Sequence, residues 1–252
     1  MCRYQVSVFE GNTGEIKRGF GEEMINEVYN IDCMEFMKTC KDKKYDLAIV
    51  DPPYGIGDNW NKDSRAQFYG HKNSFNDVSP KDEYFQELFR ISKNQIIWGC
   101  NYYWQFIPPS NNLIFWDKKK NFFTQHGSEG ELAWTSYSKY PLLKVELVWN
   151  GCVTCEDYIR IHPHQKPIKL YKWQLNIYAR SGDYILDTHV GSGSSRIACY
   201  ELGFDFEGCE LDADYWQAQE ERFKVEKARI DGKFYLPDND DSLFGGINEK
   251  FR

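Results

Sequence analysis

Leu47-Ala48-Ile49-Val50-Asp51-Pro52-Pro53-Tyr54 is the stretch that decides the fold. The four apolar residues predict a buried strand, and the two prolines end it because proline cannot donate to a sheet ladder. The strand would deliver the Asp51 carboxylate to its own carboxyl end, where open α/β sheets place their chemistry. There Asp51 and the Pro52 carbonyl could accept hydrogen bonds from an amino group, beside the flat ring of Tyr54. The alternative is a strand end whose aspartate caps a turn.

A second strand and turn lie near the other end of the chain. Residues 184–187 (Tyr-Ile-Leu-Asp) predict a buried strand, residues 188–194 a glycine-containing turn, and a helix follows from about Ser195. Glycines let a ligand approach the backbone, and a helix start offers free N–H groups. Glu210 ends the next predicted strand, at about the distance expected for a carboxylate that binds a ribose. A nicotinamide enzyme would share this logic, but the turn lacks the third glycine that packs under a pyrophosphate.

Two shorter segments complete the pattern. Residues 161–167 (Ile-His-Pro-His-Gln-Lys-Pro) precede a predicted helix at 168–179, and Pro167 suits its first turn. Residues 28–31 predict a short strand, and Asp32 is placed as the N-cap of a helix that runs to about Cys40.

Together these segments resemble the amino-methyltransferases of DNA, which move a methyl group from S-adenosylmethionine to an exocyclic amine and carry an Asp-Pro-Pro-Tyr motif. The resemblance implies an α/β, Rossmann-like class I methyltransferase fold with a seven-stranded, mostly parallel sheet, one antiparallel strand and helices on both faces. The tetrapeptide precedes the glycine turn along the chain, which is the circularly permuted order of the beta class.

The resemblance also assigns roles to residues. Asp51, Pro52, Pro53 and Tyr54 are the expected catalytic residues. The cofactor S-adenosyl-L-methionine is expected to bind Asp32, Cys33, His162, Gln165, Lys166, Asp187, His189, Gly191, Ser192, Gly193, Ser194 and Glu210. The chain departs from the family at Thr188 and His189, where family members more often have Pro-Phe.

The expected reaction is methylation of the N6 amine of adenine in DNA. The target base would leave the duplex and stack on Tyr54, while Asp51 and the Pro52 carbonyl bind its amine. Family members that act on cytosine tend to have Ser at the position of Asp51, which favours adenine. Three alternatives stay open: an N4-cytosine DNA methyltransferase, an enzyme that modifies RNA or a protein glutamine, and a non-catalytic subunit that binds donor and DNA.

The charge distribution bears on the DNA partner. The chain has 252 residues and a net charge of −7, yet residues 110–180 carry 10 Lys and Arg against 6 Asp and Glu. Such a locally basic region could meet phosphates. Within a single catalytic domain at 1–252 we expect two inserts, a DNA-contacting loop at 58–80 and a short target-recognition segment at 137–160. The candidate DNA contacts are Arg65, Lys72, Lys118, Lys139 and Lys144.

The remaining predictions concern environment and partners. Eight scattered cysteines and the lack of an apolar leader predict a cytoplasmic protein. Cys152 and Cys155 form a single Cys-x-x-Cys, so no metal site is expected. Residues 4–20 predict a hairpin and 231–252 a flexible tail. The resemblance implies double-stranded DNA as the partner, and allows a homodimer and a cognate restriction endonuclease.

Overall fold

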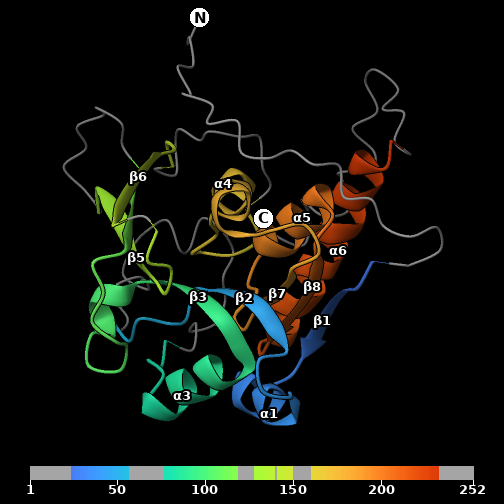
Figure 1. Ribbon diagram of the computed structural model, residues 1–252. Coiled ribbons are helices and arrows are strands. Elements are labelled where there is room, and N and C mark those ends of the chain that lie inside the picture. Colours follow the sequence, from blue (N-terminus) through green and yellow to red (C-terminus); the bar gives the residue numbers. More distant parts are fainter. Residues whose placement is uncertain (1–23, 57–76, 119–127, 140, 150–159, 233–252) are drawn as a thin grey trace, which may run out of the picture.

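A mixed sheet forms the centre of the protein (Figure 1). The structure is a computed structural model that describes residues 24–56, 77–118, 128–139, 141–149 and 160–232. In these residues eight strands lie in the order β1-β8-β7-β2-β3-β5-β4-β6, and β5 runs antiparallel to both of its neighbours. The strands are β1 (Asn26–Asn30), β2 (Tyr45–Val50), β3 (Ser92–Trp98), β4 (Leu113–Asp117), β5 (Gly130–Thr135), β6 (Leu142–Glu146), β7 (Tyr184–Asp187) and β8 (Asp205–Glu210).

Helices cover both faces of this sheet (Figure 1). One face carries α4 (Ile168–Tyr178), α5 (Ser194–Leu202) and α6 (Ala213–Ile230), and the other carries α1 (Cys33–Thr39) and α3 (Asp82–Ile91). A short 3-10 turn, η1 (Cys100–Tyr102), follows β3. The arrangement is the three-layer α/β architecture that the motif order predicts.

The central strand shows why the sequence adopts this fold. Along β2, Leu47 and Ile49 point into the core beneath α4, whereas Ala48 and Val50 point into the core shared with α1 and α3. All four side chains are buried. A strand covered on both faces needs apolar residues at every position, and this explains the continuous run before Asp51.

The predicted fold class is confirmed, with three local differences. The described sheet has one strand more than expected, because β6 pairs in parallel with β4 inside the predicted target-recognition segment at 137–160. Within β6 the only buried residue is Val145, so the strand leaves little periodic pattern in the sequence. The run Gln95-Ile96-Ile97-Trp98 predicts a strand, and the observed strand β3 begins earlier, at Ser92. Pro167 is the N-cap residue of α4 and lies just before its first turn.

Some predictions fall outside the described residues. These are the hairpin at 4–20, most of the loop at 58–80 with Arg65 and Lys72, the pair Cys152 and Cys155, and nearly all of the tail at 231–252. Among the helices that the structure describes, none combines the length and the apolar character needed to cross a membrane.

Candidate active site

The tips of β2 and β7 form the two halves of the candidate site. These strands are parallel neighbours, with Leu47 opposite Ile185 and Ala48 opposite Leu186, so both end at the carboxyl edge of the sheet. Asp51 follows β2 and Asp187 ends β7. Because side chains alternate along a strand, both aspartates continue the series that faces α4.

The Asp51 carboxylate is held at both oxygens. The Tyr54 hydroxyl donates a hydrogen bond to Oδ1 at 2.7 Å, and the Lys166 ammonium donates to Oδ2. The Lys166 side chain is only 4% exposed. Lys166 comes from the 161–167 loop, so the structure places this residue, expected at the donor, against the tetrapeptide at residues 51–54.

Neighbouring residues fix the rest of the tetrapeptide. The Tyr54 ring stacks on Tyr102, with ring centroids 4.8 Å apart and planes inclined by 14°. The Tyr103 hydroxyl contacts the carbonyl oxygens of Pro52 at 2.8 Å and of Pro53 at 2.6 Å. Gly99 adopts a φ of +67°, and a Cβ there would lie 2.2 Å from Tyr54 Cε1. A glycine is therefore required for Tyr54 to approach β3 so closely.

Glu131, which belongs to none of the sequence motifs, lies in the same cluster. Its Oε2 lies 3.0 Å from Lys166 Nζ, while Oε1 accepts a hydrogen bond from Lys118. Burial alone would raise the pKa of Glu131, but the charges of Lys166 and Lys118 outweigh burial and hold it below its usual range. Burial opposes the charge of Lys166 too, and Asp51 and Glu131 raise its pKa in spite of this.

One signal in the sequence could have revealed Glu131. It alternates along β5 with Ala133 and Thr135, both of which are fully buried. A charged residue at an inward-facing position of a strand needs a partner, because an unpaired buried charge is costly.

The second half of the site is the glycine turn between β7 and α5. The Gly191 N–H donates to Glu210 Oε2 at 2.8 Å, so the end of β8 is tied to the turn. The His162 ring packs against Gly191, since a Cβ there would lie 3.7 Å from the ring. The 161–167 loop therefore contacts both halves, with His162 at the glycine turn and Lys166 at Asp51.

Asp187 lies beneath this turn in a neutral setting. It accepts hydrogen bonds from the Ser195 hydroxyl at 2.6 Å and from the His189 N–H at 3.0 Å. No Lys or Arg pairs with Asp187 among the residues that the structure describes. Burial raises the pKa of Asp187 to about 7.

Arg222 on α6 forms hydrogen bonds with both serines of the turn. Arg222 Nη1 donates to the Ser192 carbonyl at 2.7 Å and to Ser194 Oγ at 2.9 Å, and the two serine hydroxyls lie 3.2 Å apart. Gly193 precedes α5 in the left-handed conformation, and no side chain caps the start of the helix. The first N–H groups of α5 thus lack a capping side chain.

The remaining predicted donor residues have structural partners of their own. Asp32 caps α1 as expected, accepting from the N–H of Met34 at 2.8 Å. Cys33 Sγ lies 3.8 Å from His189 Nε2, and burial lowers the pKa of His189 to about 4. Gln165 Oε1 accepts from the Ile161 N–H at 3.1 Å and so shapes the 161–167 loop itself.

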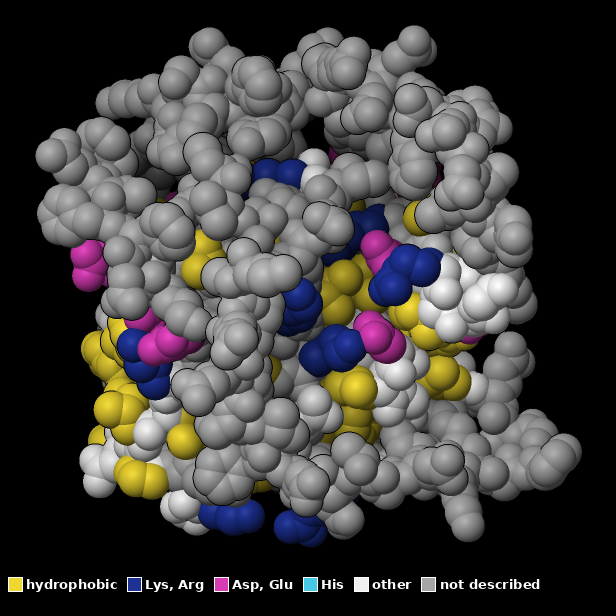
Figure 2. Space-filling view, turned by 90° about the horizontal axis from the view of Figure 1, so that it is seen from above, with side chains coloured by type: hydrophobic (Ala, Val, Ile, Leu, Met, Phe, Trp, Pro, Cys, Tyr) yellow, Lys and Arg dark blue, Asp and Glu magenta, His cyan; other side chains and the backbone are white. Residues whose placement is uncertain are grey.

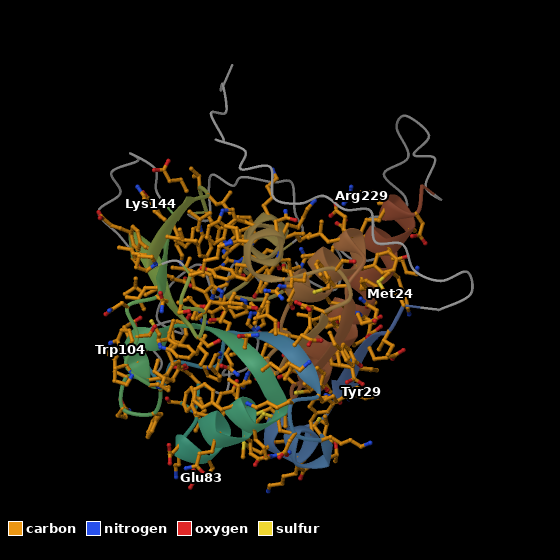
Figure 3. All side chains as sticks on the ribbon, viewed as in Figure 1. Met24, Tyr29, Glu83, Trp104, Lys144 and Arg229 are labelled. Atoms are coloured by element: carbon orange, nitrogen blue, oxygen red, sulfur yellow. The ribbon has the colours of Figure 1, made fainter. Side chains whose placement is uncertain are left out.

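The candidate DNA contacts are dispersed. Lys118 pairs with Glu131 at the edge of the site, and Lys144 lies on β6, where it pairs with Asp117 and Glu146 at 2.9 Å each (Figure 3). Lys139 is exposed. On the face shown in Figure 2, Lys and Arg side chains lie beside Asp and Glu side chains. The described residues on this face therefore present mixed charge.

The geometry of the glycine turn fits an adenosyl group. Gly191 has a φ of +54° and ordinary van der Waals space at its Cβ position, the start of α5 lacks a side-chain cap, and Glu210 ends the adjacent strand. Glycine backbone and an acidic residue at the next strand end are the features that bind a nucleoside in such folds. The part of the chain that the structure describes contains no cluster of three or more ligating side chains able to hold a metal ion.

Comparison with known proteins identifies a family. A family model described as DNA methylase, of the N6 and N4 methyltransferases, matches residues 91–221, just over half of the chain. The type II methyltransferase M2.DpnII of Streptococcus pneumoniae is 24% identical over 246 residues, covering 77% of this chain and 88% of that protein.

Two solved structures share the fold. TTHA0409 of Thermus thermophilus, assigned as a DNA modification methylase and solved with S-adenosyl-L-methionine, has a TM-score of 0.53 at 16% identity and covers 80% of this chain and 94% of its own. The cytosine-N4-specific PvuII DNA methyltransferase has a TM-score of 0.52 at 13% identity, with 84% and 96% covered. The family predicted from the motifs is confirmed: the chain belongs to the N6/N4 DNA methylases, which are S-adenosylmethionine-dependent methyltransferases.

Proposed function

We propose that the protein transfers a methyl group from S-adenosylmethionine to the N6 amine of adenine in double-stranded DNA, at a specific recognition sequence. The observation that supports this proposal is the 161–167 loop, which links the tetrapeptide at Asp51 to the glycine turn at Gly191. An acceptor for an amine and a turn suited to an adenosyl group are thereby held at one edge of the sheet.

The donor would be held by the second half of the site. Glu210 would accept hydrogen bonds from the ribose hydroxyls, Gly191 would allow close approach of the donor, and His162 would flank it. When bound, S-adenosylmethionine supplies an electrophilic methyl group on a positively charged sulfur. The chain's own residues have to position the acceptor amine against it.

Asp51 is the residue that we assign to the target amine. A carboxylate has about four lone-pair sites, and Tyr54 and Lys166 occupy two of them, so Asp51 can still accept an N–H from the base. The Pro52 carbonyl, contacted by Tyr103, has a second lone pair for the other N–H. Holding both hydrogens directs the nitrogen lone pair at the methyl group, so catalysis is mainly alignment and electrostatics.

Cytosine N4 is the second candidate for the methylated atom. Its exocyclic amine could make the same two hydrogen bonds, and the fold neighbour PvuII is named as cytosine-N4-specific. Asp at position 51, where cytosine enzymes of the family tend to have Ser, favours adenine. A non-catalytic subunit is disfavoured because Asp51 is oriented by a hydrogen bond from Tyr54 and an ion pair with Lys166.

We further propose that DNA is contacted through the segments at 58–80 and 137–160, including Lys139 and Lys144. The named type II methyltransferase relative suggests that this chain protects DNA from a cognate restriction endonuclease. A homodimer is a further proposal that rests on the family resemblance.

Nucleoside analysis after methylation tests the proposed reaction. Mixed-sequence DNA is incubated with the protein and labelled S-adenosylmethionine, digested, and separated into nucleosides. We expect N6-methyladenine, and no label transfer by the Asp51→Ala variant. N4-methylcytosine would support the second candidate, and normal transfer by Asp51→Ala would refute the role of Asp51.

A further inference from the structure

We propose that Glu131 is a positioning residue for methyl transfer: it holds the Lys166 ammonium in place so that Lys166 can orient the Asp51 carboxylate. The inference rests on the proposed function and adds to it a residue from a strand that carries none of the recognised motifs. Its basis is a chain of charged contacts that runs from Lys118 through Glu131 and Lys166 to Asp51.

The direction of β5 explains why Glu131 reaches this site. Because β5 is antiparallel, its first residues lie at the edge where the parallel strands end. Glu131 is directly opposite Trp116 on β4 and lies on the same face of β5 as Ala133, which is opposite Trp98 on β3. This face is the one covered by α4, whose first residue follows the 161–167 loop.

Two tryptophans form an apolar floor under the charges. Lys166 Nζ lies 5.5 Å from the centre of the Trp98 ring, and Lys118 Nζ lies 4.9 Å from that of Trp116. The two indoles pack edge to face, with centroids 6.0 Å apart. Ring faces attract cations but cannot replace a counter-ion, so each ammonium also needs a carboxylate.

Glu131 meets a requirement that Asp51 cannot meet alone. Lys166 is buried, and Asp51 must also receive the target amine, which would share the carboxylate with Lys166. Glu131 provides a second anion 3.0 Å from the ammonium, so Lys166 stays charged and in place while Asp51 engages the base. Lys118 in turn compensates the charge of Glu131.

Substitution of Glu131 by Gln tests the proposal. The change keeps the size of the side chain but removes the charge that holds Lys166. We expect kcat for DNA methylation to fall on the order of 10- to 100-fold, as for a misplaced catalytic group. The KM values for DNA and donor should change little, since neither is assigned to Glu131.

The pH profile separates positioning from a structural role. The ionisable and charged groups around Lys166 are Asp51 and Tyr54 after β2, Glu131 on β5, Lys118 after β4, Tyr171 on α4 and His164 on its own loop. Removing the negative charge of Glu131 lowers the pKa of Lys166, so the alkaline limb of the kcat profile should move to lower pH in Glu131→Gln. A purely structural change would leave that limb unmoved.

Two further variants complete the experiment. Glu129→Gln changes an exposed residue just before β5 and should keep the wild-type kcat and profile. Glu131→Asp keeps the charge, so we expect a smaller loss of kcat and an alkaline limb close to that of the wild type. Melting temperature and calorimetric donor binding verify that each variant is folded. If Glu131→Gln does not fold, the proposal is tested with Glu131→Asp.

The outcomes are distinct. Wild-type kcat with an unshifted profile in folded Glu131→Gln, or unchanged kcat in Glu131→Asp should the Gln variant not fold, overturns the role of Glu131 and leaves the proposed function intact. Failure of the wild-type protein to methylate any DNA overturns the proposed function, and the role of Glu131 with it.

Discussion

Two aspartates at neighbouring strand tips have opposite surroundings in this fold. Asp51 lies among ions, paired with Lys166 and linked through it to Glu131 and Lys118. Asp187, one strand away, is fully buried and receives neutral donors, the Ser195 hydroxyl and a backbone N–H. The same residue type at the same edge can thus be paired with ions or surrounded by neutral donors, and the loop or helix packed against each tip decides which.

Removing the cation shared by Asp51 and Glu131 should have the largest effect. Lys166→Met leaves two largely shielded carboxylates, whose side chains are 15% and 19% exposed, without their common partner, a change that costs about 3–5 kcal/mol of unfolding free energy. Urea unfolding measures this loss. The matched control is Lys172→Met, whose partly exposed pair with Glu201 should contribute less than about 1 kcal/mol. Equal stability of the Lys166 and Lys172 variants would contradict the contrast between the two tips.

Substitution of a glycine by alanine should also cost more stability in the half of the site that contains Asp51 than in the half that contains Asp187. In Gly99→Ala the positive φ costs roughly 1–3 kcal/mol. The clash with Tyr54 adds roughly 1–3 kcal/mol for overpacking and displaces the ring from Asp51.

Gly191→Ala meets no such clash and should lose about 1–2 kcal/mol of stability through its φ alone. Its main effect should be weaker binding of S-adenosylmethionine, measured by calorimetry. Weaker donor binding in Gly99→Ala than in Gly191→Ala would contradict the assignment of the donor to the half that contains Gly191.

The pH dependence of stability should show whether the native protein favours protonated Asp187. Its folded-state pKa of about 7 lies above the ordinary value of about 3.9, so the native protein favours the protonated acid. The associated stability is complete below about pH 4 and is lost as pH rises through about 7, by up to about 4 kcal/mol. Asp187→Asn stays neutral throughout.

We therefore expect the melting temperature of Asp187→Asn, relative to the wild type, to rise between pH 5 and pH 8. A relative melting temperature that falls over this range would show that the native site favours charged Asp187.

A lysine far from both tips should have the smallest effect. Lys144 makes exposed ion pairs at the β6 edge, so Lys144→Ala should change stability by less than about 1 kcal/mol (Figure 3). If Lys144 contacts a phosphate, the slope of log affinity for DNA against log salt should decrease by about 1. An unchanged slope would remove Lys144 from the DNA interface.

The parts that the sequence predicts correctly depend on local pattern. The apolar run of β2, the capping Asp32 and the turn before α5 are all encoded within a few residues, and the structure contains each of them. Glu131 could not be found in this way, because its position depends on the direction of β5 and on pairing with β4.

Lys166 shows the same limit. Its motif is local, but the carboxylate that it meets is set by where the 161–167 loop lies over the ordered sheet. Strand β6 was missed for a related reason: its pairing with β4 stabilises a segment with little hydrophobic alternation.

Single-turnover methyl transfer by Asp51→Ala, at saturating S-adenosylmethionine and with donor affinity measured on the same sample, separates the roles of the two strand tips. We expect a donor Kd close to that of the wild type, together with a transfer rate lower by at least about 10²-fold. Loss of donor binding in this variant, or transfer at the wild-type rate, would contradict the division of the site into an amine-binding tip at β2 and a donor-binding tip at β7.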